Sequence, residues 1–300
     1  MVANDSAGCK KFFHYLILGL LVVLGSACTP MQLTPITPEP TGLSRPGHVV
    51  WHDLITDDVA AAKEFYGKLL GWSFEQHGEY TLILNKNKPI GGMVKLDQSG
   101  TERKSAGWIP YFSMPDVDDT AEWVLSVGGK IIEGPGEMAG RGRYAMIADP
   151  LGTPLVILHS SSGDPVPAEA HIGDWFWDEL WTTDVEAALS FYQSLDGYAA
   201  QRVSAEGNEP YWVLIDADEN DSGGITKVPF EKLASQWVPA LKVAKLEELV
   251  QRVAQLGGEV IINPDHPLSD GGVALIKDPT GGIFMMDVWL SENKIQEQQP

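Results

Sequence analysis

The sequence predicts an α+β fold made of two tandem copies of one domain, and three observations support this prediction. The stretch 51–72 returns as residues 177–198 without a gap, 126 positions later. A second pair of stretches, which begin at Trp108 and Trp237, repeats 129 positions apart. In both copies, short apolar runs typical of strands alternate with a run at helical spacing. A copied supersecondary unit fixes an architecture before any single residue is interpreted.

Each copy begins with a strand that leads into a helix. Residues 49–55 are predicted to form the strand, Asp57 and Asp58 offer an N-cap, residues 59–70 carry apolar side chains at helical spacing, and Gly71 ends the helix. The same helix is expected over residues 184–195. Further short strands are expected at residues 80–84, 91–96, 211–215 and 223–227.

Composition limits the class of function. The chain has 300 residues, 44% of them hydrophobic, which suffices for two domains of ordinary size and an additional segment. A formal net charge of −20 argues against nucleic acid as a partner, because phosphate binding needs clustered Lys and Arg. The only cysteines, Cys9 and Cys28, precede the repeat. A disulfide framework or a cysteine-rich zinc site in the domains is therefore excluded.

The amino-terminal segment resembles an export signal. Lys10 and Lys11 precede an apolar run over residues 12–24, and small residues at 25–27 lead to Cys28. This order is similar to the lipobox of bacterial lipoproteins, which implies cleavage after residue 27, lipidation of Cys28 and anchoring to the cell envelope, in the outer membrane if the organism has one. Gly25 stands where that pattern usually has Leu. An uncleaved membrane anchor is the alternative. The proline-spaced residues 28–46 are expected to form an extended tether.

Four ordered motifs recur in both copies: W-x-[DE]-L-x-T-x-D, F-Y-x-x-L-x-G-[WY], a G-G pair before a strand, and D-P-x-G. They resemble the glyoxalase/bleomycin-resistance/extradiol-dioxygenase superfamily, the vicinal oxygen chelate (VOC) fold. The resemblance implies four βαβββ modules, with two modules per domain forming a half-open barrel around a cleft. The expected domains are residues 47–160 and 172–290, joined by a linker at 161–171 and followed by a disordered tail at 291–300.

The positions of the family's metal ligands can be located from these motifs. The first falls on Trp51 and Trp177, and the third on Val156 and Met285. The second lies near residues 109–110 in the first domain and 238–239 in the second, where no metal ligand occurs. No cofactor is therefore expected. The alternative is a divalent metal bound by His52, which misses the first position by one residue and would need a β-bulge to turn inward.

Other residues are then expected to line the clefts. If Trp51 and Trp177 face inward, strand alternation places Asp53 and Glu179 on the same faces. Glu179 and Asp287 could form a carboxylate pair that acts as acid or base, with Asp53 as a further catalytic candidate. A purely structural role for these groups is the alternative. Arg141 and Arg143 are expected in a solvated hairpin turn. The candidate ligand-binding residues are Trp51, Asp53, Tyr111, Tyr144, Trp177, Glu179, Asp287 and Trp289.

The favoured function is a lipid-anchored envelope protein whose two VOC domains bind a small apolar or aromatic molecule without the family's metal. Ligand pockets are mostly apolar and carry a few placed polar groups, as the Trp and carboxylate pairs would provide. Two alternatives stay open. One is a metal-dependent glyoxalase-type lyase or dioxygenase-type oxidoreductase with ligands in shifted register, and the other is a non-catalytic envelope scaffold. A chain with four modules can complete both clefts alone, so a monomer is expected.

Overall fold

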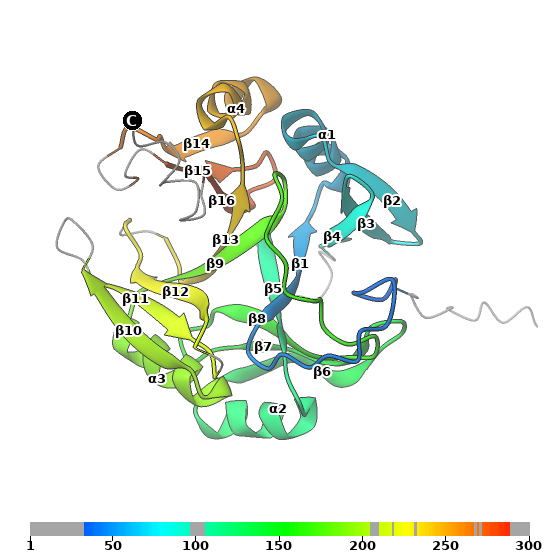
Figure 1. The fold of residues 1–300 in the computed structure, drawn as a ribbon, viewed down its shortest axis with the longest axis vertical. Helices are drawn as coiled ribbons and strands as arrows, with labels where there is room; N and C mark the ends of the chain where they lie inside the picture. Colours follow the sequence, from blue (N-terminus) through cyan, green and yellow to red (C-terminus); the bar gives the residue numbers. More distant parts are fainter. Residues whose placement is uncertain are drawn as a thin grey trace, which may run out of the picture. The chain divides into compact units, whose positions relative to one another are not determined.

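The computed structural model describes residues 33–96, 106–204, 210–217, 219–230, 233–266, 269 and 272–288. Within these ranges the chain forms two eight-stranded sheets, one for each copy of the repeat (Figure 1). The first sheet contains β1 (Val49–Thr56), β2 (Ser73–His77), β3 (Tyr80–Asn85), β4 (Lys88–Lys95), β5 (Gly107–Ser113), β6 (Lys130–Met138), β7 (Gly142–Ala148) and β8 (Pro154–Ser160). The second contains β9 (Trp175–Thr182), β10 (Ala199–Ser204), β11 (Pro210–Ile215), β12 (Asp221–Lys227), β13 (Gln236–Lys242), β14 (Glu259–Ile262), β15 (Val273–Lys277) and β16 (Ile283–Asp287). The helices are α1 (Val59–Leu70), α2 (Val117–Ser126), α3 (Val185–Asp196) and α4 (Leu246–Val253), which continues as a 3₁₀ turn over Ala254–Leu256.

The strand order confirms the four-module interpretation. The first sheet runs β2-β3-β4-β1-β5-β8-β7-β6, and the second runs β10-β11-β12-β9-β13-β16-β15-β14. Each module is one strand, one helix and three further strands, and the first strands of two modules pair antiparallel at the centre of each sheet. The predicted α+β fold with two tandem VOC-type domains is thus present.

The helix boundaries follow from their caps. The Asp58 carboxylate accepts the Ala61 amide at 2.9 Å, and Gly71 ends α1 with a φ of 76°. In the repeated copy, Asp184 accepts the Ala187 amide at 3.0 Å, and Gly197 has a φ of 72°. A side-chain acceptor satisfies an otherwise unpaired amide at the start of a helix, and glycine adopts positive φ without a steric penalty at its end.

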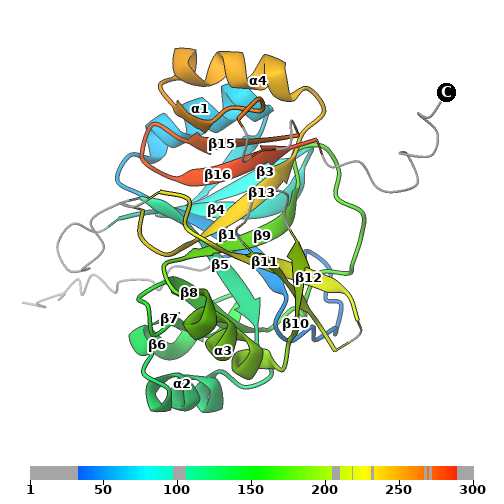
Figure 2. The same ribbon diagram turned by 90° about the vertical axis from the view of Figure 1, so that its left-hand side faces the viewer.

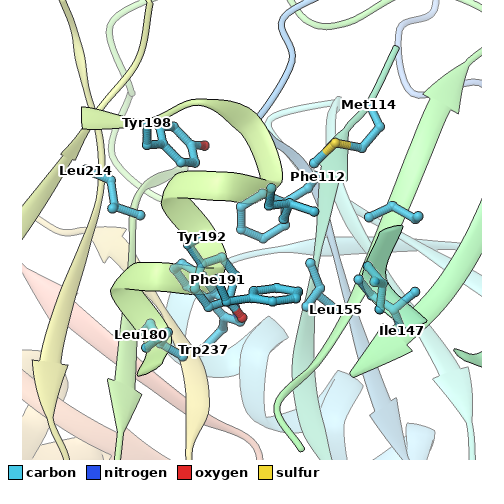
Figure 3. Close-up of a cluster of buried hydrophobic side chains, with 14 of the residues drawn as sticks. Phe112, Met114, Ile147, Leu155, Leu180, Phe191, Tyr192, Tyr198, Leu214 and Trp237 are labelled. Carbon is cyan, nitrogen blue, oxygen red and sulfur yellow. The ribbon is translucent and has the colours of Figure 1, made fainter. Parts of the chain in front are cut away.

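The two domains share their hydrophobic cores. The views in Figures 1 and 2 agree that α1 lies beside α4 and α2 beside α3, so each helix neighbours a helix of the other domain. Trp123 of α2 and Phe191 of α3 have ring centroids 5.2 Å apart. In Figure 3, Phe191 and Tyr192 of α3 lie in one cluster with Phe112 of the first sheet. Burial across the boundary joins the described residues of the two domains into one folded body.

The repeated F-Y and D-P-x-G motifs meet across this boundary. The Tyr66 hydroxyl donates to Asp278 Oδ2 at 2.8 Å, and Tyr192 donates to Asp149 Oδ2 at 3.2 Å. Each tyrosine therefore bonds the closing turn of the other domain, which explains why the two motifs recur together. A buried carboxylate needs such a donor, since an unpaired buried charge is costly.

Several sequence predictions lie outside the described residues. These are the signal at residues 1–27, Cys28, Trp289 and the tail at residues 291–300. No helix in the described ranges is long and apolar enough to cross a membrane.

Candidate functional site

We call the face of each sheet that lies opposite the helices its inner face. On the first inner face, Asp53 is 2% exposed and is surrounded by donors. The Trp51 indole and the Tyr80 hydroxyl donate to its Oδ1 at 2.9 and 2.7 Å, and the Tyr111 hydroxyl donates to Oδ2 at 2.6 Å. Burial, and then the charge of Asp53, raises the pKa of both tyrosines well above their usual value. Both hydroxyls therefore remain donors, and the carboxylate charge is held by hydrogen bonds.

Arg141 completes this network. Its side chain is fully buried, its Nη2 donates to the Tyr80 hydroxyl at 2.8 Å, and its Cζ lies 4.2 Å from the centre of the Trp51 ring. Burial alone would lower the pKa of Arg141, but the neighbouring Tyr80, Asp53 and Tyr111 raise it. The prediction of a solvated turn was wrong for Arg141, because an aromatic face and a nearby carboxylate compensate the guanidinium. Arg143 does lie at the surface, where it pairs with Asp118 at 2.6 Å.

The chain's own amino-terminal segment covers the first inner face. Leu33 and Ile36 are 5% and 4% exposed and pack in the cluster that contains Trp51, Tyr80 and Tyr111. The Leu33 amide donates to the Ala139 carbonyl at 2.8 Å, and Arg141 Nε donates to the Thr34 carbonyl at 3.0 Å. Residues 33–46 therefore belong to the folded body, and the interpretation of this part as an extended tether was wrong. Burying the apolar side chains at positions 33 and 36 is favourable in free energy compared with leaving them exposed to water.

The second inner face repeats the arrangement of tryptophan, acid and tyrosine found on the first. We call this arrangement the frame: Trp51, Asp53 and Tyr80 on the first face, and Trp177, Glu179 and Tyr211 on the second. Trp177 donates to the Tyr211 hydroxyl at 3.0 Å, as Trp51 does to Tyr80 at 3.1 Å. Glu179 stands in register with Gly224, as Asp53 does with Gly92. Both glycines are required, since a Cβ at Gly92 or Gly224 would lie 1.8 or 1.9 Å from the tyrosine hydroxyl oxygen. The repeated G-G motif thus makes room for this tyrosine.

The two faces differ in what fills them. Strand register matches Tyr111 with Ala240 and Leu158 with Asp287. The sequence position that corresponds to Arg141 is Asp270, which lies outside the described residues. The frame residues Trp51, Asp53 and Tyr80 are buried, whereas Trp177, Glu179 and Tyr211 are partly exposed. Trp177, Glu179 and Tyr211 are therefore more exposed than their counterparts, whereas Ala240 and Met285 of the same face are buried.

Glu179 is the titratable group with the clearest functional potential. Burial of its carboxyl group raises its pKa to about 7, the Trp181 indole opposes this by hydrogen bonding, and the charge of Asp287 adds to it. A carboxyl group that titrates near neutrality can donate or accept a proton under physiological conditions. Burial, and then the Glu179 charge, keeps the Tyr211 hydroxyl protonated by raising its pKa.

A pocket of about 750 Å³ opens beside Trp177 at the junction of the two domains. Two histidines of the first domain line it and pair with aspartates of the second. His52 Nε2 lies 2.7 Å from Asp178 Oδ1, and His48 Nε2 lies 2.8 Å from Asp216 Oδ2. Burial and the neighbouring Arg45 lower the pKa of His48. The volume lies in the range of small-molecule sites.

Comparison with known proteins agrees with this architecture. The family model described as "Glyoxalase/Bleomycin resistance protein/Dioxygenase superfamily" matches residues 45–157 and 170–286. The chain belongs to this superfamily.

Individual relatives of the superfamily are distant. The putative glyoxylase CFP32 of Mycobacterium tuberculosis is 26% identical over 246 residues, which cover 80% of this chain and 94% of the relative. The anthracycline biosynthesis protein DauV of a Streptomyces species is 28% identical over 260 residues, with 80% and 92% covered. Homoprotocatechuate 2,3-dioxygenase from B. fuscum has a TM-score of 0.58 at 12% identity, with 85% of this chain and 74% of the dioxygenase covered. The Mn(II)-bound glyoxalase from Novosphingobium aromaticivorans has a TM-score of 0.57 at 13% identity, with 82% and 84% covered.

The superfamily's metal positions carry residues that do not fit a metal. Strand register places Tyr111 between Trp51 and Val156, the residues at the first and third expected positions. In the second domain the row is Trp177, Ala240 and Met285. Indole, methyl and thioether groups are poor ligands for the hard divalent cations that oxygen ligands bind, and the Tyr111 hydroxyl is committed to Asp53. Within the described ranges, no three His, Cys, Asp or Glu side chains are grouped to hold a metal ion.

His52 lies on the opposite face from Trp51. The bulge in β1 falls between Val49 and Trp51, so it does not change the direction of His52. The ring instead packs on Trp175, with centroids 5.2 Å apart, and bonds Asp178. His52 as an inward metal ligand was therefore wrong. Residues 52 and 178 are matched by the 126-residue repeat, so equivalent positions of the two domains contact each other here.

The structure brings most of the sequence-predicted residues onto the inner faces. Trp51, Asp53 and Tyr111 meet in one network, and the charge of Asp287 acts on Glu179. Tyr144 packs at the edge of the first inner face, and its hydroxyl donates to Glu133 at 2.5 Å. Tyr80, Tyr211 and Arg141 were missed. The tyrosines carry a sequence signal, because each stands near the start of a corresponding strand, whereas nothing in the sequence marks Arg141 as buried.

Proposed function

We propose that the second inner face binds a small apolar or aromatic molecule without the superfamily's metal. The observation that carries this proposal is the difference in exposure between two matched frames. Trp177, Glu179 and Tyr211 are partly exposed, whereas their counterparts are buried beneath Leu33, Ile36 and Arg141. Trp177 also lines the 750 Å³ pocket at the domain junction, whose lining includes neither Glu179 nor Tyr211. An aromatic wall with a few polar groups is typical of a ligand site.

The chain's relatives support only the class of this function. CFP32 is named as a putative glyoxylase and DauV as a protein of anthracycline biosynthesis, and both names concern small molecules. At 26% and 28% identity, the identity of a ligand does not transfer. The proposal therefore rests on the exposed frame of this chain.

The test is ligand-induced stabilisation of the full chain. A library of small aromatic compounds is screened by thermal unfolding, because a ligand that binds only the native state raises Tm. Hits are expected to lose their effect in Ala240→Tyr, which places on the second inner face the side chain that Tyr111 places on the first. Tyr144→Phe, at the edge of the first face, is the matched control and should leave the hits unchanged. If the Ala240→Tyr protein keeps every hit, the proposed site is wrong.

A second candidate function, acid–base catalysis at Glu179, is favoured by its pKa of about 7. A carboxyl group with this pKa beside Asp287 could move a proton on a bound substrate without a metal. A bell-shaped or sigmoidal dependence of turnover on pH that disappears in Glu179→Gln would support catalysis. If a ligand binds but no turnover is detected, either with added metal or with a chelator, the result would favour a binding protein.

We propose in addition that the protein is an exported, monomeric lipoprotein attached through Cys28. The support is the sequence order of basic residues, apolar run, small residues and cysteine. Two or more acyl chains on one residue give stable anchoring. Cys28→Ser is expected to release the protein from the membrane fraction, and mass spectrometry of the wild-type amino terminus should show lipid on Cys28. Unmodified Cys28 in the membrane fraction would instead indicate an uncleaved anchor.

A further inference from the structure

Three polar side chains join the two domains on one side of the junction pocket. His48 lies directly before β1, and its Nε2 is 2.8 Å from Oδ2 of Asp216, the residue that follows β11. Arg45 Nη2 lies 3.1 Å from the other ring nitrogen of His48, Nδ1. All three residues line the pocket of about 750 Å³. We call Arg45, His48 and Asp216 the junction cluster.

The contacts of the junction cluster require a neutral imidazole. A neutral ring has one N–H donor and one acceptor nitrogen, whereas an ionised carboxylate only accepts. Nε2 of His48 therefore carries the proton toward Asp216, and Nδ1 accepts from the Arg45 guanidinium. In a protonated ring both nitrogens carry hydrogen. Arg45 would then lose its acceptor and face a second cation.

The groups around His48 act on its charge in opposite directions. Burial first, and then the charge of Arg45, lower the pKa of His48, whereas the charges of Asp216 and Asp164 oppose this. Asp164 is held on other donors, because its Oδ2 accepts the Arg45 amide and the Ser113 hydroxyl, each at 2.6 Å. The other charged or titratable side chains that line the pocket are His52, Lys88, Asp178 and Asp221, and of these His52 pairs with Asp178 and Lys88 with Asp174.

Within the junction cluster, Arg45 is the member that can respond to a proton. In the part of the chain that the structure describes, its guanidinium forms no ion pair with a carboxylate, and the His48 ring is its acceptor. Asp216 also accepts the Asn220 amide at 2.8 Å and would keep a protonated His48 as an ion pair. Protonation of the ring therefore favours the contact with Asp216 and opposes the contact with Arg45.

From this geometry we infer that the junction cluster is an acid-sensitive gate of the pocket, in which Arg45 packs against neutral His48 and moves away from protonated His48. Asp216 holds the ring in both states, so the movement is confined to the Arg45 side chain and the pocket wall that it forms. Acidification then widens the pocket beside Trp177 and adds a free guanidinium to it. The gate lies at the domain junction and is independent of the ligand site proposed on the second inner face.

Histidine NMR of the detergent-solubilised full chain tests the coupling, with ¹³C at Cε1 and the His48 signal assigned from His48→Gln. His48 is expected to gain its proton below pH 6.5, the ordinary value. Arg45→Met should raise the pH of this titration because the opposing cation is lost, and Arg45→Lys should keep it low. Arg143→Met, which removes a surface arginine paired with Asp118, is the matched control and should change nothing. If Arg45→Met leaves the His48 titration where it was, the gate inference is wrong.

Acrylamide quenching of tryptophan fluorescence tests the movement, since acrylamide is uncharged and Trp175 and Trp177 line the pocket. Quenching of the wild-type protein should increase over the pH range in which His48 gains its proton. His48→Gln and Arg45→Met should both lack this step, and the comparison between proteins removes the contribution of Glu179, which titrates in all of them. Constant quenching in the wild type, or a step that persists in His48→Gln, would overturn the inference.

Discussion

The inner faces of the two sheets share one frame and differ in the side chains that pack against it. Each places a tryptophan of its first strand against a tyrosine hydroxyl, with an acidic residue beside a glycine. The first frame is closed by Tyr111, Arg141 and the segment that begins at Leu33. The second has Ala240 in place of Tyr111 and remains partly exposed.

This difference indicates that two copies of one domain can take different roles, one structural and one functional. In the first domain every polar atom of Asp53 has a donor, so the motif acts as a stabilising network. In the second domain the equivalent acid is desolvated, lies near another acid and titrates at about 7. A group held in such an unfavourable state is a candidate for function rather than stability.

The largest effect is expected for Arg141→Ala. Removing the guanidinium leaves Asp53 and the Tyr80 hydroxyl without their buried cation, and truncating one partner of a buried charged network costs about 3–5 kcal/mol. Denaturant unfolding should show this loss in the free energy of unfolding. Arg143→Ala removes a surface arginine two residues further along, in β7, and should leave the unfolding midpoint unchanged. Equal effects of the two substitutions would mean that Arg141 does not support the network.

Asp53→Asn should destabilise the protein by roughly 3 kcal/mol. The amide nitrogen cannot accept the Tyr111 hydroxyl or the two donors at Oδ1, so at least one buried donor loses its partner. The same measurement on Glu179→Gln should show no loss at pH 8. A loss of similar size in both variants would contradict the division between a stabilising and a functional face.

Ile36→Ala should cost about 2 kcal/mol or more, because the side chain is 4% exposed against the first inner face. Leu43→Ala is the control, since Leu43 is 41% exposed in the same segment and should change stability by less than about 0.5 kcal/mol. Faster proteolysis within residues 33–46 of the Ile36→Ala protein would show that the segment had detached. Unchanged unfolding and proteolysis would mean that the segment does not seal the face.

The smallest effect, and one of opposite sign, is expected for Glu179→Gln. The folded-state pKa of about 7 exceeds the ordinary value of 4.5, so the folded protein holds a proton that the unfolded chain has lost between these values. Wild-type stability should therefore fall as pH rises from about 4.5 to 7. Above pH 7 the glutamine variant should be more stable than wild type, and the difference should vanish near pH 4.5. A constant difference across this range would exclude Glu179 as its source.

Local sequence signals predicted the local structure well. Helix α1 runs from Val59 to Leu70 as its spacing indicated, because Asp58 and Gly71 act through bonds within a few residues. The direction of Trp51 and Asp53 followed from strand alternation, and both lie on one face. His52 was open to two interpretations, since a bulge one residue away decides which face a side chain meets.

The sequence by itself determined the duplication, the four modules and the helix caps, since these depend on residue identity, spacing and local bonds. Only the tertiary structure decided which frame is filled and which is open. Arg141 lies 61 residues after Tyr80 and 88 residues after Asp53 in the sequence, so only the folding of the chain brings these three side chains together. The burial of Leu33 and Ile36 and the pairing of His52 with Asp178 likewise depend on contacts between distant segments, whose free energy no local pattern records.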